Sequence, residues 1–274
     1  MKILVTGANG YLGQGIVKSL LDLGHNVYAA DRLTNYVDKR AHCFQCDLFS
    51  VENPYIFFDK PEILLHLAWR DGFVHYSDAH INDLPDHYRF IQSFAMSDVN
   101  MIACMGSMHE IGFFEGSIKE DTPCNPLTPY GISKNALRAL TKNLCERNNK
   151  LFQWLRGFYI VGNTEYGSSI FSKIVQAEKE GKKLFPFTSG LNQFDFIDYS
   201  DFCFRVAKCV EQKSILGIIN ICSGRPERLS DRVERFIKDN HYNIKLDYGA
   251  FPDRPYDSKA VWGDSHKIEL ILNA

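Results

Sequence analysis

A tyrosine and a lysine four residues apart, Tyr130 and Lys134, carry the clearest chemical potential in this chain. Residues at this spacing share one face of a helix, one turn from each other. Thr128 is a suitable N-cap and Pro129 a suitable first helical residue, so we expect a helix to begin just before the pair. An ammonium beside a phenol favours the phenolate, which predicts a lowered tyrosine pKa and an acid/base group for an alcohol or ketone. The same spacing also occurs by chance, as a half-buried tyrosine beside a solvated lysine. Other segments of the chain are therefore needed to support a catalytic role for the pair.

The N-terminal segment has the pattern of a nucleotide site. Lys2–Thr6 is a short apolar run typical of a buried strand, and Gly7, Gly10 and Gly13 follow it. Glycines between a strand and a helix allow a tight turn and close approach to a pyrophosphate, which the N–H groups of the new helix then face. The helix is predicted from apolar residues at helical spacing, namely Ile16, Val17, Leu20, Leu21 and Leu23.

A second apolar strand, Val27–Ala30, ends in Asp31. A carboxylate at this position can accept both ribose hydroxyls of NAD and repels a 2′-phosphate, although a helix cap or a turn residue is the plain alternative. Arg32 could instead hold a 2′-phosphate. The sequence therefore favours NAD(H) as the cofactor and leaves NADP(H) open.

With these features the chain resembles, from end to end, the extended short-chain dehydrogenases/reductases of the epimerase/dehydratase branch, which act on nucleotide-activated sugars. The matching segments are Thr6–Gly13, Asp47-Leu48, His66–Trp69, Ser107, Tyr130 with Lys134, Leu155–Tyr159, Asp195–Asp198, and Arg254-Pro255 with Trp262–Asp264. The resemblance implies an α/β fold, a Rossmann-type doubly wound parallel sheet with a small C-terminal substrate-binding lobe.

The resemblance also implies roles for individual residues. Tyr130 would exchange the proton, Lys134 would bond the nicotinamide ribose, and Ser107 would hydrogen-bond the reacting oxygen. The implied cofactor-binding residues are Thr6, Gly7, Asn9, Gly10, Tyr11, Leu12, Gly13, Asp31, Arg32, Asp47, Leu48, Leu67, Ala68, Asn82, Tyr130 and Lys134. The implied substrate-binding residues are Ser107, Asn163, Arg225 and Arg254. Asn82 is equally consistent with a cap or turn, and surface arginines are usually solvated.

Several positions depart from the family pattern. Dehydratases of the family follow the catalytic Ser/Thr with an Asp-Glu pair, whereas this chain has Met108 and His109, so dehydration is not expected. His109 could act as an acid/base residue near neutral pH, or it could simply bond a nearby carboxylate or backbone group. Glu110 is one residue out of register, and an extended segment would point it to the other face. Tyr159 and Phe194 stand where the family has an asparagine and a diphosphate-binding arginine.

These observations predict an NAD(P)H-dependent reductase of a nucleotide-activated 4-keto-6-deoxysugar, similar to the dTDP-4-dehydro-6-deoxyglucose reductases that serve deoxysugar and surface polysaccharide biosynthesis. One alternative is a nucleotide-sugar 4-epimerase that keeps NAD tightly bound. Another is a non-catalytic, cofactor-sensing binding protein. Such proteins usually lose the tyrosine or the lysine, and this chain keeps both.

Composition restricts the remaining classes. The chain has 274 residues, a net charge of −2 with mixed signs, and eight scattered cysteines, which is typical of a reduced, cytoplasmic protein. No nucleic-acid partner is expected. Neither a signal peptide nor a membrane partner is expected, because the chain starts with a strand and no apolar run approaches about 20 residues. Cys43 and Cys46 form a lone CxxC, from which we expect no metal site.

Alternating strand and helix patterns in the first half indicate a parallel sheet covered on both faces. Strands are predicted at 63–67, 101–105, 151–161 and 218–222, a short strand near Phe185, and helices at 79–95 with a break near Pro85, 128–149, 170–181, 199–212 and 230–240. We expect residues 1–160 to form the NAD(P)-binding domain and 161–274 mainly the substrate lobe, interleaved with it. The resemblance also implies a homodimer that packs through the helix containing Tyr130. The apolar residues Ala136, Leu137, Leu140 and Leu144 permit this packing and equally permit packing on the sheet.

Overall fold

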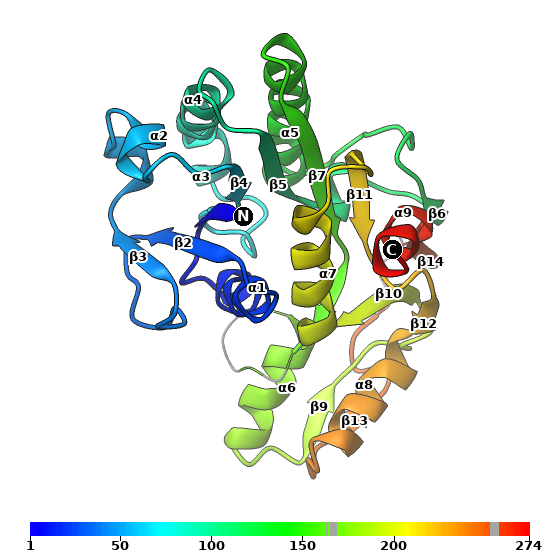
Figure 1. The fold of residues 1–274 in the computed structure, drawn as a ribbon. Coiled ribbons are helices and arrows are strands. Elements are labelled where there is room, and N and C mark those ends of the chain that lie inside the picture. Colours follow the sequence, from blue (N-terminus) through cyan, green and yellow to red (C-terminus); the bar gives the residue numbers. More distant parts are fainter. Residues whose placement is uncertain (163, 165–168, 253–257) are drawn as a thin grey trace.

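The computed structural model describes residues 1–162, 164, 169–252 and 258–274. Within them, a parallel seven-stranded sheet has the order β11-β7-β5-β4-β1-β2-β3 (Figure 1). The order reverses between β1 and β4, the place where open α/β sheets bind ligands at the carboxyl ends of the strands. The strands are β1 (Lys2–Thr6), β2 (Asn26–Asp31), β3 (His42–Gln45), β4 (Ile63–His66), β5 (Met101–Ser107), β7 (Leu151–Gly157) and β11 (Gly217–Ile221).

Helices cover both faces of this sheet because its strands are apolar on both sides. In β1, Ile3 and Val5 pack in one core with α1 (Tyr11–Asp22), α7 (Tyr199–Glu211) and α9 (His266–Leu272). Leu4 packs in the other core with α4 (Leu84–Ala95) and α5 (Pro129–Arg147). α2 (Pro54–Phe57) and α3 (Ala79–Asn82) are short, as are the 3₁₀ turns η1 (Leu48–Ser50) and η2 (Met108–Glu110).

A smaller lobe lies at the bottom of Figure 1, away from α4 and α5. Its sheet has the order β12-β10-β14-β6, with β8 paired to β10, and α6 and α8 share a third core. The lobe elements are β6 (Gly116–Ile118), β8 (Tyr159–Val161), α6 (Ile170–Lys179), β9 (Leu184–Pro186), β10 (Gln193–Asp198), β12 (Pro226–Arg228), α8 (Leu229–Asp239), β13 (Lys245–Asp247) and β14 (Ala260–Gly263).

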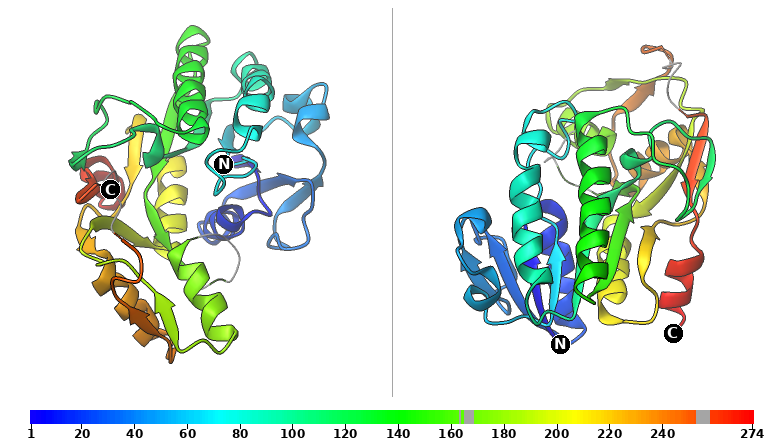
Figure 2. Two further views of the ribbon diagram at one scale, coloured as in Figure 1. Left: turned by 180° about the vertical axis from the view of Figure 1, so that it is seen from behind. Right: turned by 90° about the horizontal axis from the view of Figure 1, so that it is seen from above.

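The chain passes several times between the large sheet and the smaller lobe. β10 of the lobe runs directly into α7, which packs against the large sheet, and β11 then becomes an edge strand of that sheet. Tyr199, the first residue of α7, donates its hydroxyl to the Tyr11 carbonyl at 2.5 Å and accepts the Gly15 N–H at 3.0 Å. These contacts tie the start of α7 to the start of α1, and the left view of Figure 2 shows the two helices, yellow and dark blue, next to each other.

The doubly wound parallel sheet is confirmed, and so is the break near Pro85, where α3 ends at Asn82 and α4 begins at Leu84. The predicted single strand 151–161 is wrong. It divides at Phe158 into β7 of the large sheet and β8 of the lobe, because the two halves pair with different strands. In the described part of the chain, every helix is too short or too polar to cross a bilayer.

Candidate active site

The glycine-rich turn after β1 is packed so closely that side chains are excluded. Gly7 has φ +68°, and a Cβ there would lie 2.7 Å from the Ala68 backbone nitrogen at the end of β4. A Cβ on Gly13 would lie 2.1 Å from the Gly7 carbonyl oxygen. The turn thus brings the predicted residues Gly7, Gly13 and Ala68 together at the switch point of the sheet.

The start of α1 fits a dinucleotide pyrophosphate. Its N-cap is Gly10, with no side-chain cap and no acidic residue in the first turn among the described residues. The first N–H groups of the helix are therefore available to an anion. Asp31 lies beside this turn, where its carboxylate accepts the N–H of Asn9 at 2.9 Å and of Arg32 at 2.7 Å. The position suits the adenosine ribose, and NAD bound here would supply a hydride acceptor or donor.

The other predicted cofactor residues surround this turn to different degrees. Thr6 and Leu48 are buried and Leu67 is partly buried, while Asp47 caps η1 by accepting the Phe49 N–H. Tyr11 packs its ring against Tyr199, with centroids 4.5 Å apart, and Leu12 packs against the core. Arg32 is exposed. Asn82 is also exposed, and the buried polar side chain of α3 is His80 instead.

Ser107, Tyr130 and Lys134 come together at the carboxyl end of β5. Thr128 caps α5 as predicted, with its hydroxyl accepting the Gly131 N–H at 3.2 Å, and this places Tyr130 in the first turn. Ser107 ends β5 and hydrogen-bonds the Tyr130 phenol, which by itself lowers the phenol pKa. The buried ammonium of Lys134 donates to the Met105 carbonyl at 2.9 Å.

The prediction of a lowered tyrosine pKa is wrong for this structure. Burial raises the pKa of Tyr130 to about 12, more than the Ser107 hydrogen bond lowers it, and the Glu110 charge adds to the rise. Burial also lowers the pKa of Lys134 to about 8, because the ammonium is desolvated. Tyr130 is therefore a neutral phenol at working pH, the form that donates a proton.

The segment after Ser107 is not extended. The Ser107 hydroxyl accepts the His109 N–H at 3.3 Å and starts the 3₁₀ turn η2. This turn carries Glu110 into the protein interior, where its carboxylate accepts Arg156 Nε at 2.5 Å and Trp154 Nε1 at 2.8 Å. Glu110 and Arg156 are both 0% exposed, so this carboxylate has a structural partner and no access to substrate.

Three histidines surround Tyr130: His109, which the sequence singled out, and His75 and His80, which it did not. The His75 ring stacks on the phenol ring at 5.0 Å with an interplanar angle of 7°, and its carbonyl accepts the Tyr130 N–H at 3.1 Å. The His80 and His109 rings lie 5.2 and 6.1 Å from that of Tyr130. Burial lowers the pKa of His109 to about 4, so its imidazole is neutral. His75 lies in a loop without periodicity, and only its nearness in sequence to the His66–Trp69 motif could have drawn attention to it.

The structure describes some of the residues predicted to bind the substrate. Arg225 is exposed on the loop before β12, and Asn163 and Arg254 lie outside the described residues. Tyr159 and Phe194 pack against each other with ring centroids 4.7 Å apart. The family's asparagine and arginine are thus replaced by an aromatic pair in the lobe.

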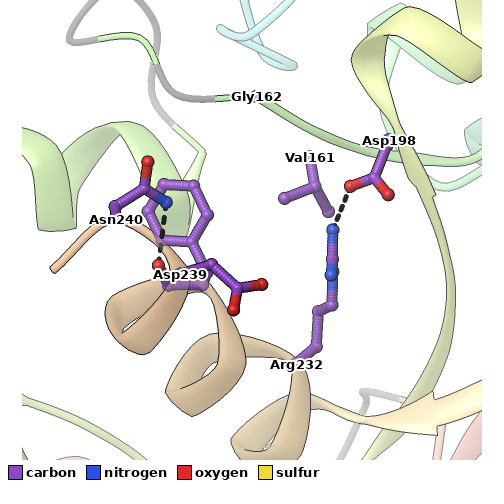
Figure 3. Close-up of a pocket in the computed structure, with 7 residues that line it drawn as sticks. Val161, Gly162, Asp198, Arg232, Asp239 and Asn240 are labelled. Carbon is purple, nitrogen blue, oxygen red and sulfur yellow. Dashed lines mark hydrogen bonds and ion pairs between the residues drawn. The ribbon is translucent and has the colours of Figure 1, made fainter.

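A pocket of about 230 Å³ lies in the lobe between β8, β10 and α8, and neither Ser107, Tyr130 nor Lys134 lines it. Figure 3 shows Arg232 pointing toward Asp198 on one side of this pocket, with Asp239 and Asn240 on the other. Arg232 pairs with Asp198 through one terminal nitrogen, whereas its buried Nε has no hydrogen-bond partner among the residues that the structure describes. This pocket is therefore separate from the cluster of Ser107, Tyr130 and Lys134. In the described ranges, no group of His, Cys, Asp and Glu side chains is arranged to hold a metal ion.

A parallel sheet with a glycine turn at its switch point, an acidic residue at the end of β2 and a Ser-Tyr-Lys cluster define a dinucleotide-dependent oxidoreductase. Residues 3–222 match the NAD dependent epimerase/dehydratase family. The chain belongs to this family, and NAD is the cofactor that its site fits.

Individual proteins resemble the chain along nearly its whole length. It is 41% identical over 269 residues, 96% of this chain and 99% of the relative, to the dTDP-6-deoxy-L-talose 4-dehydrogenase (NAD(+)) of Aggregatibacter actinomycetemcomitans. A UDP-N-acetylglucosamine 4-epimerase from Methanobrevibacter ruminantium M1 superposes with a TM-score of 0.85 at 19% identity, over 98% of this chain and 91% of that one. A UDP-glucuronic acid 4-epimerase from Bacillus cereus, in complex with UDP-glucuronic acid and NAD, gives 0.84 at 20% identity over 100% and 93%. These two structures share the fold.

Proposed function

We propose that this protein is an NAD(H)-dependent oxidoreductase acting at C4 of a nucleotide-activated 6-deoxyhexose, and that it works as a reductase of the 4-keto sugar. The end-to-end similarity to a dTDP-6-deoxy-L-talose 4-dehydrogenase supports both the substrate class and the position of the reaction. A 4-dehydrogenase and a 4-keto reductase catalyse the same reaction in opposite directions. We take dTDP as the preferred nucleotide for the same reason.

The observation that carries the proposal is the partly buried Tyr130 phenol, which hydrogen-bonds Ser107 and whose pKa is raised to about 12, so that it is neutral. Reduction of a ketone places a hydride on C4 and a proton on the attached oxygen. Tyr130 donates that proton, and the phenolate that it leaves lies one helical turn from the Lys134 ammonium. The Ser107 hydroxyl hydrogen-bonds the same oxygen and stabilises the charge that develops on it.

The surroundings of Ser107 support reduction over dehydration. Elimination of water from a hexose needs an acid and a base at the sugar carbons, and the family's Asp-Glu pair is replaced by Met108 and His109. Methionine cannot transfer a proton. Glu110, the acidic residue nearest in sequence, is sealed against Arg156 and Trp154. Tyr130 is the proton donor that this arrangement leaves for the reacting oxygen.

The alternative is a 4-epimerase, which oxidises C4 and returns the hydride to the other face with no net change in NADH. Purified protein should be mixed with NADH or NADPH and a panel of dTDP-, UDP-, GDP- and CDP-4-keto-6-deoxysugars, with absorbance followed at 340 nm and products identified by NMR. We expect one NADH consumed per dTDP-keto-sugar reduced. Interconversion of a non-keto nucleotide sugar without added cofactor would instead establish the epimerase.

We also propose a homodimer formed along α5. Leu137 and Leu144 are buried against the sheet, whereas Ile132 is 47% and Leu140 39% exposed on the outer side of the helix. These exposed side chains are available to a second subunit. Light scattering on size-exclusion fractions should give twice the chain mass, and an Ile132→Lys/Leu140→Lys variant should give the monomer.

A further inference from the structure

We propose that Trp69 is a positioning residue of the active site. Its ring contacts Lys134, and its N–H holds, through His80, the loop whose His75 ring stacks on Tyr130. Trp69 is the third residue after β4. Its role is independent of the sugar on which the enzyme acts, and it rests on the proposed function only in taking Tyr130 and Lys134 as the catalytic pair.

The first contact is with the lysine. The Lys134 ammonium is buried and lies 3.9 Å from the centroid of the Trp69 ring. Its hydrogen bond goes to the Met105 carbonyl, and none of the described carboxylates pairs with it. A cation over an indole face is attracted by the negative face of the ring, and this attraction is strongest where water is excluded. The indole therefore replaces part of the hydration that Lys134 loses.

The second contact reaches the tyrosine through His80. Trp69 Nε1 donates to His80 Nδ1 at 3.0 Å, which leaves the proton of this imidazole on Nε2. His80 Nε2 in turn donates to the Val74 carbonyl at 2.9 Å. The next residue is His75, whose ring and carbonyl both contact Tyr130. The Trp69 N–H thus fixes the loop that covers the phenol.

A third set of contacts holds the indole itself. The His87 ring stacks on it at 4.6 Å with an interplanar angle of 15°. His87 Nδ1 is 2.9 Å from His66 Nε2, and His66 Nδ1 is 2.8 Å from the hydroxyl of Thr6, the residue before the glycine turn. Trp69 is therefore connected through His87 and His66 to Thr6, next to the glycine-rich turn. It also contacts Lys134 directly and Tyr130 through the loop held by His80.

The titratable groups around Lys134 do not interfere with a test of its contact with the Trp69 indole. Glu110 on η2 is paired with Arg156. Cys104 on β5, His66 on β4 and His87 on α4 are buried, and burial keeps each of them neutral by raising the thiol pKa and lowering the imidazole pKa values. Tyr130 on α5 is a neutral phenol. The Cys104 thiol, the two imidazoles and the phenol therefore do not change charge between about pH 6 and the pKa of Lys134, which burial lowers to about 8.

The test separates the two contacts with two substitutions. Trp69→Phe keeps an aromatic face and removes the N–H, whereas Trp69→Leu removes both. For each variant, kcat/KM for keto-sugar reduction is measured from pH 6 to 10. The basic limb of the wild-type profile is expected near the Lys134 pKa. Trp69→Leu should move that limb about one pH unit lower, because a buried cation–π contact is worth roughly 1 to 2 kcal/mol and one pH unit corresponds to 1.36 kcal/mol.

Trp69→Phe should leave the basic limb of the pH profile in place. It should lower kcat/KM about tenfold, because the loop with His75 is no longer held against Tyr130. His80→Leu should reproduce that loss and should add little to it in the double variant, because both changes break the same connection. His80→Leu also keeps the test available if Trp69→Leu does not fold. Trp262→Leu on β14 in the lobe is the matched control, with wild-type limb and rate. A limb that stays in place in Trp69→Leu, or full additivity of Trp69→Phe and His80→Leu, would overturn the proposal.

Discussion

Two arginine–carboxylate pairs, one in each part of the molecule, are built differently. Glu110 and Arg156 are both 0% exposed, and Arg156 also donates to the Lys119 carbonyl at 3.1 Å. Arg232 is similarly buried, but the side chain of its partner Asp198 is 67% exposed at the rim of the lobe pocket. Breaking a pair that water cannot reach leaves an uncompensated charge, whereas water can replace a partner at a rim. The ion pair beside Tyr130 is therefore held entirely inside the protein, whereas the pair in the lobe keeps one carboxylate open to water.

The largest effect is expected at Tyr130, in the part of the molecule that contains the buried Glu110–Arg156 pair. Tyr130→Phe removes the proton donor and should lower kcat about 10²- to 10⁴-fold while NADH binding stays close to that of the wild type. Turnover is measured at 340 nm and binding by NADH fluorescence. Tyr76→Phe, an exposed tyrosine of the neighbouring loop, is the control and should keep full activity. A Tyr130→Phe enzyme within tenfold of the wild-type rate would remove the phenol from the mechanism.

The buried pair itself should matter next most. Glu110→Gln leaves the Arg156 charge without a partner, so the free energy of unfolding should fall by about 3 to 5 kcal/mol. Urea denaturation followed by circular dichroism measures the change. Glu227→Gln removes a carboxylate from a surface pair with Arg235 and should cost less than about 1 kcal/mol. Equal losses in the two variants would mean that Glu110 is solvated in solution.

The catalytic side should also be the acid-sensitive side. Burial lowers the pKa of His66 to about 3 and of His87 to about 2, whereas unfolded histidines titrate near about 6.5. Between these values the unfolded chain binds protons that the folded protein does not. The free energy of unfolding should therefore fall as the pH drops from about 6.5 toward 3, by roughly 2 kcal/mol per pH unit for the two groups together.

Urea midpoints at pH 7, 6, 5 and 4 test this acid sensitivity. His87→Phe keeps a ring against Trp69 and should lower the slope by about 1.4 kcal/mol per pH unit, the contribution of one histidine, while His66 and His109 continue to contribute. His266→Gln changes an exposed histidine and should leave the slope unaltered. An unchanged slope in His87→Phe would show that His87 is protonated in the folded protein.

The smallest effect is expected at the rim pair. Asp198→Asn should lower the free energy of unfolding by less than about 1 kcal/mol, because water in the pocket can solvate Arg232. The same urea experiment applies, with wild type and Glu110→Gln measured alongside. A loss above about 3 kcal/mol would place Arg232 in the same class as Arg156 and end the contrast between the two regions.

The sequence predicted the elements that carry a strong local signal. The strand, glycine turn and helix at residues 2–22 follow from apolar periodicity and the special backbone of Gly7, and α5 follows from its Thr128 cap. The direction in which Glu110 points could not be predicted, because a single hydrogen bond from the His109 N–H to Ser107 turns the chain there. The contact of Thr6, His66 and His87 joins residues up to 81 positions apart and leaves no local pattern. Short lobe strands such as β12 and β14 also lack enough residues to show an alternation.

The direct passage of β10 into α7 has a consequence for how this family can diversify. Because the chain leaves the lobe and re-enters the large sheet through β11, no single cut separates a cofactor half from a substrate half. Exchange of whole lobes by recombination would sever the Tyr199 contacts with Tyr11 and Gly15 as well as the last strand of the sheet. Replacement of single side chains within the lobe, such as the aromatic pair Tyr159 and Phe194, leaves these shared connections intact.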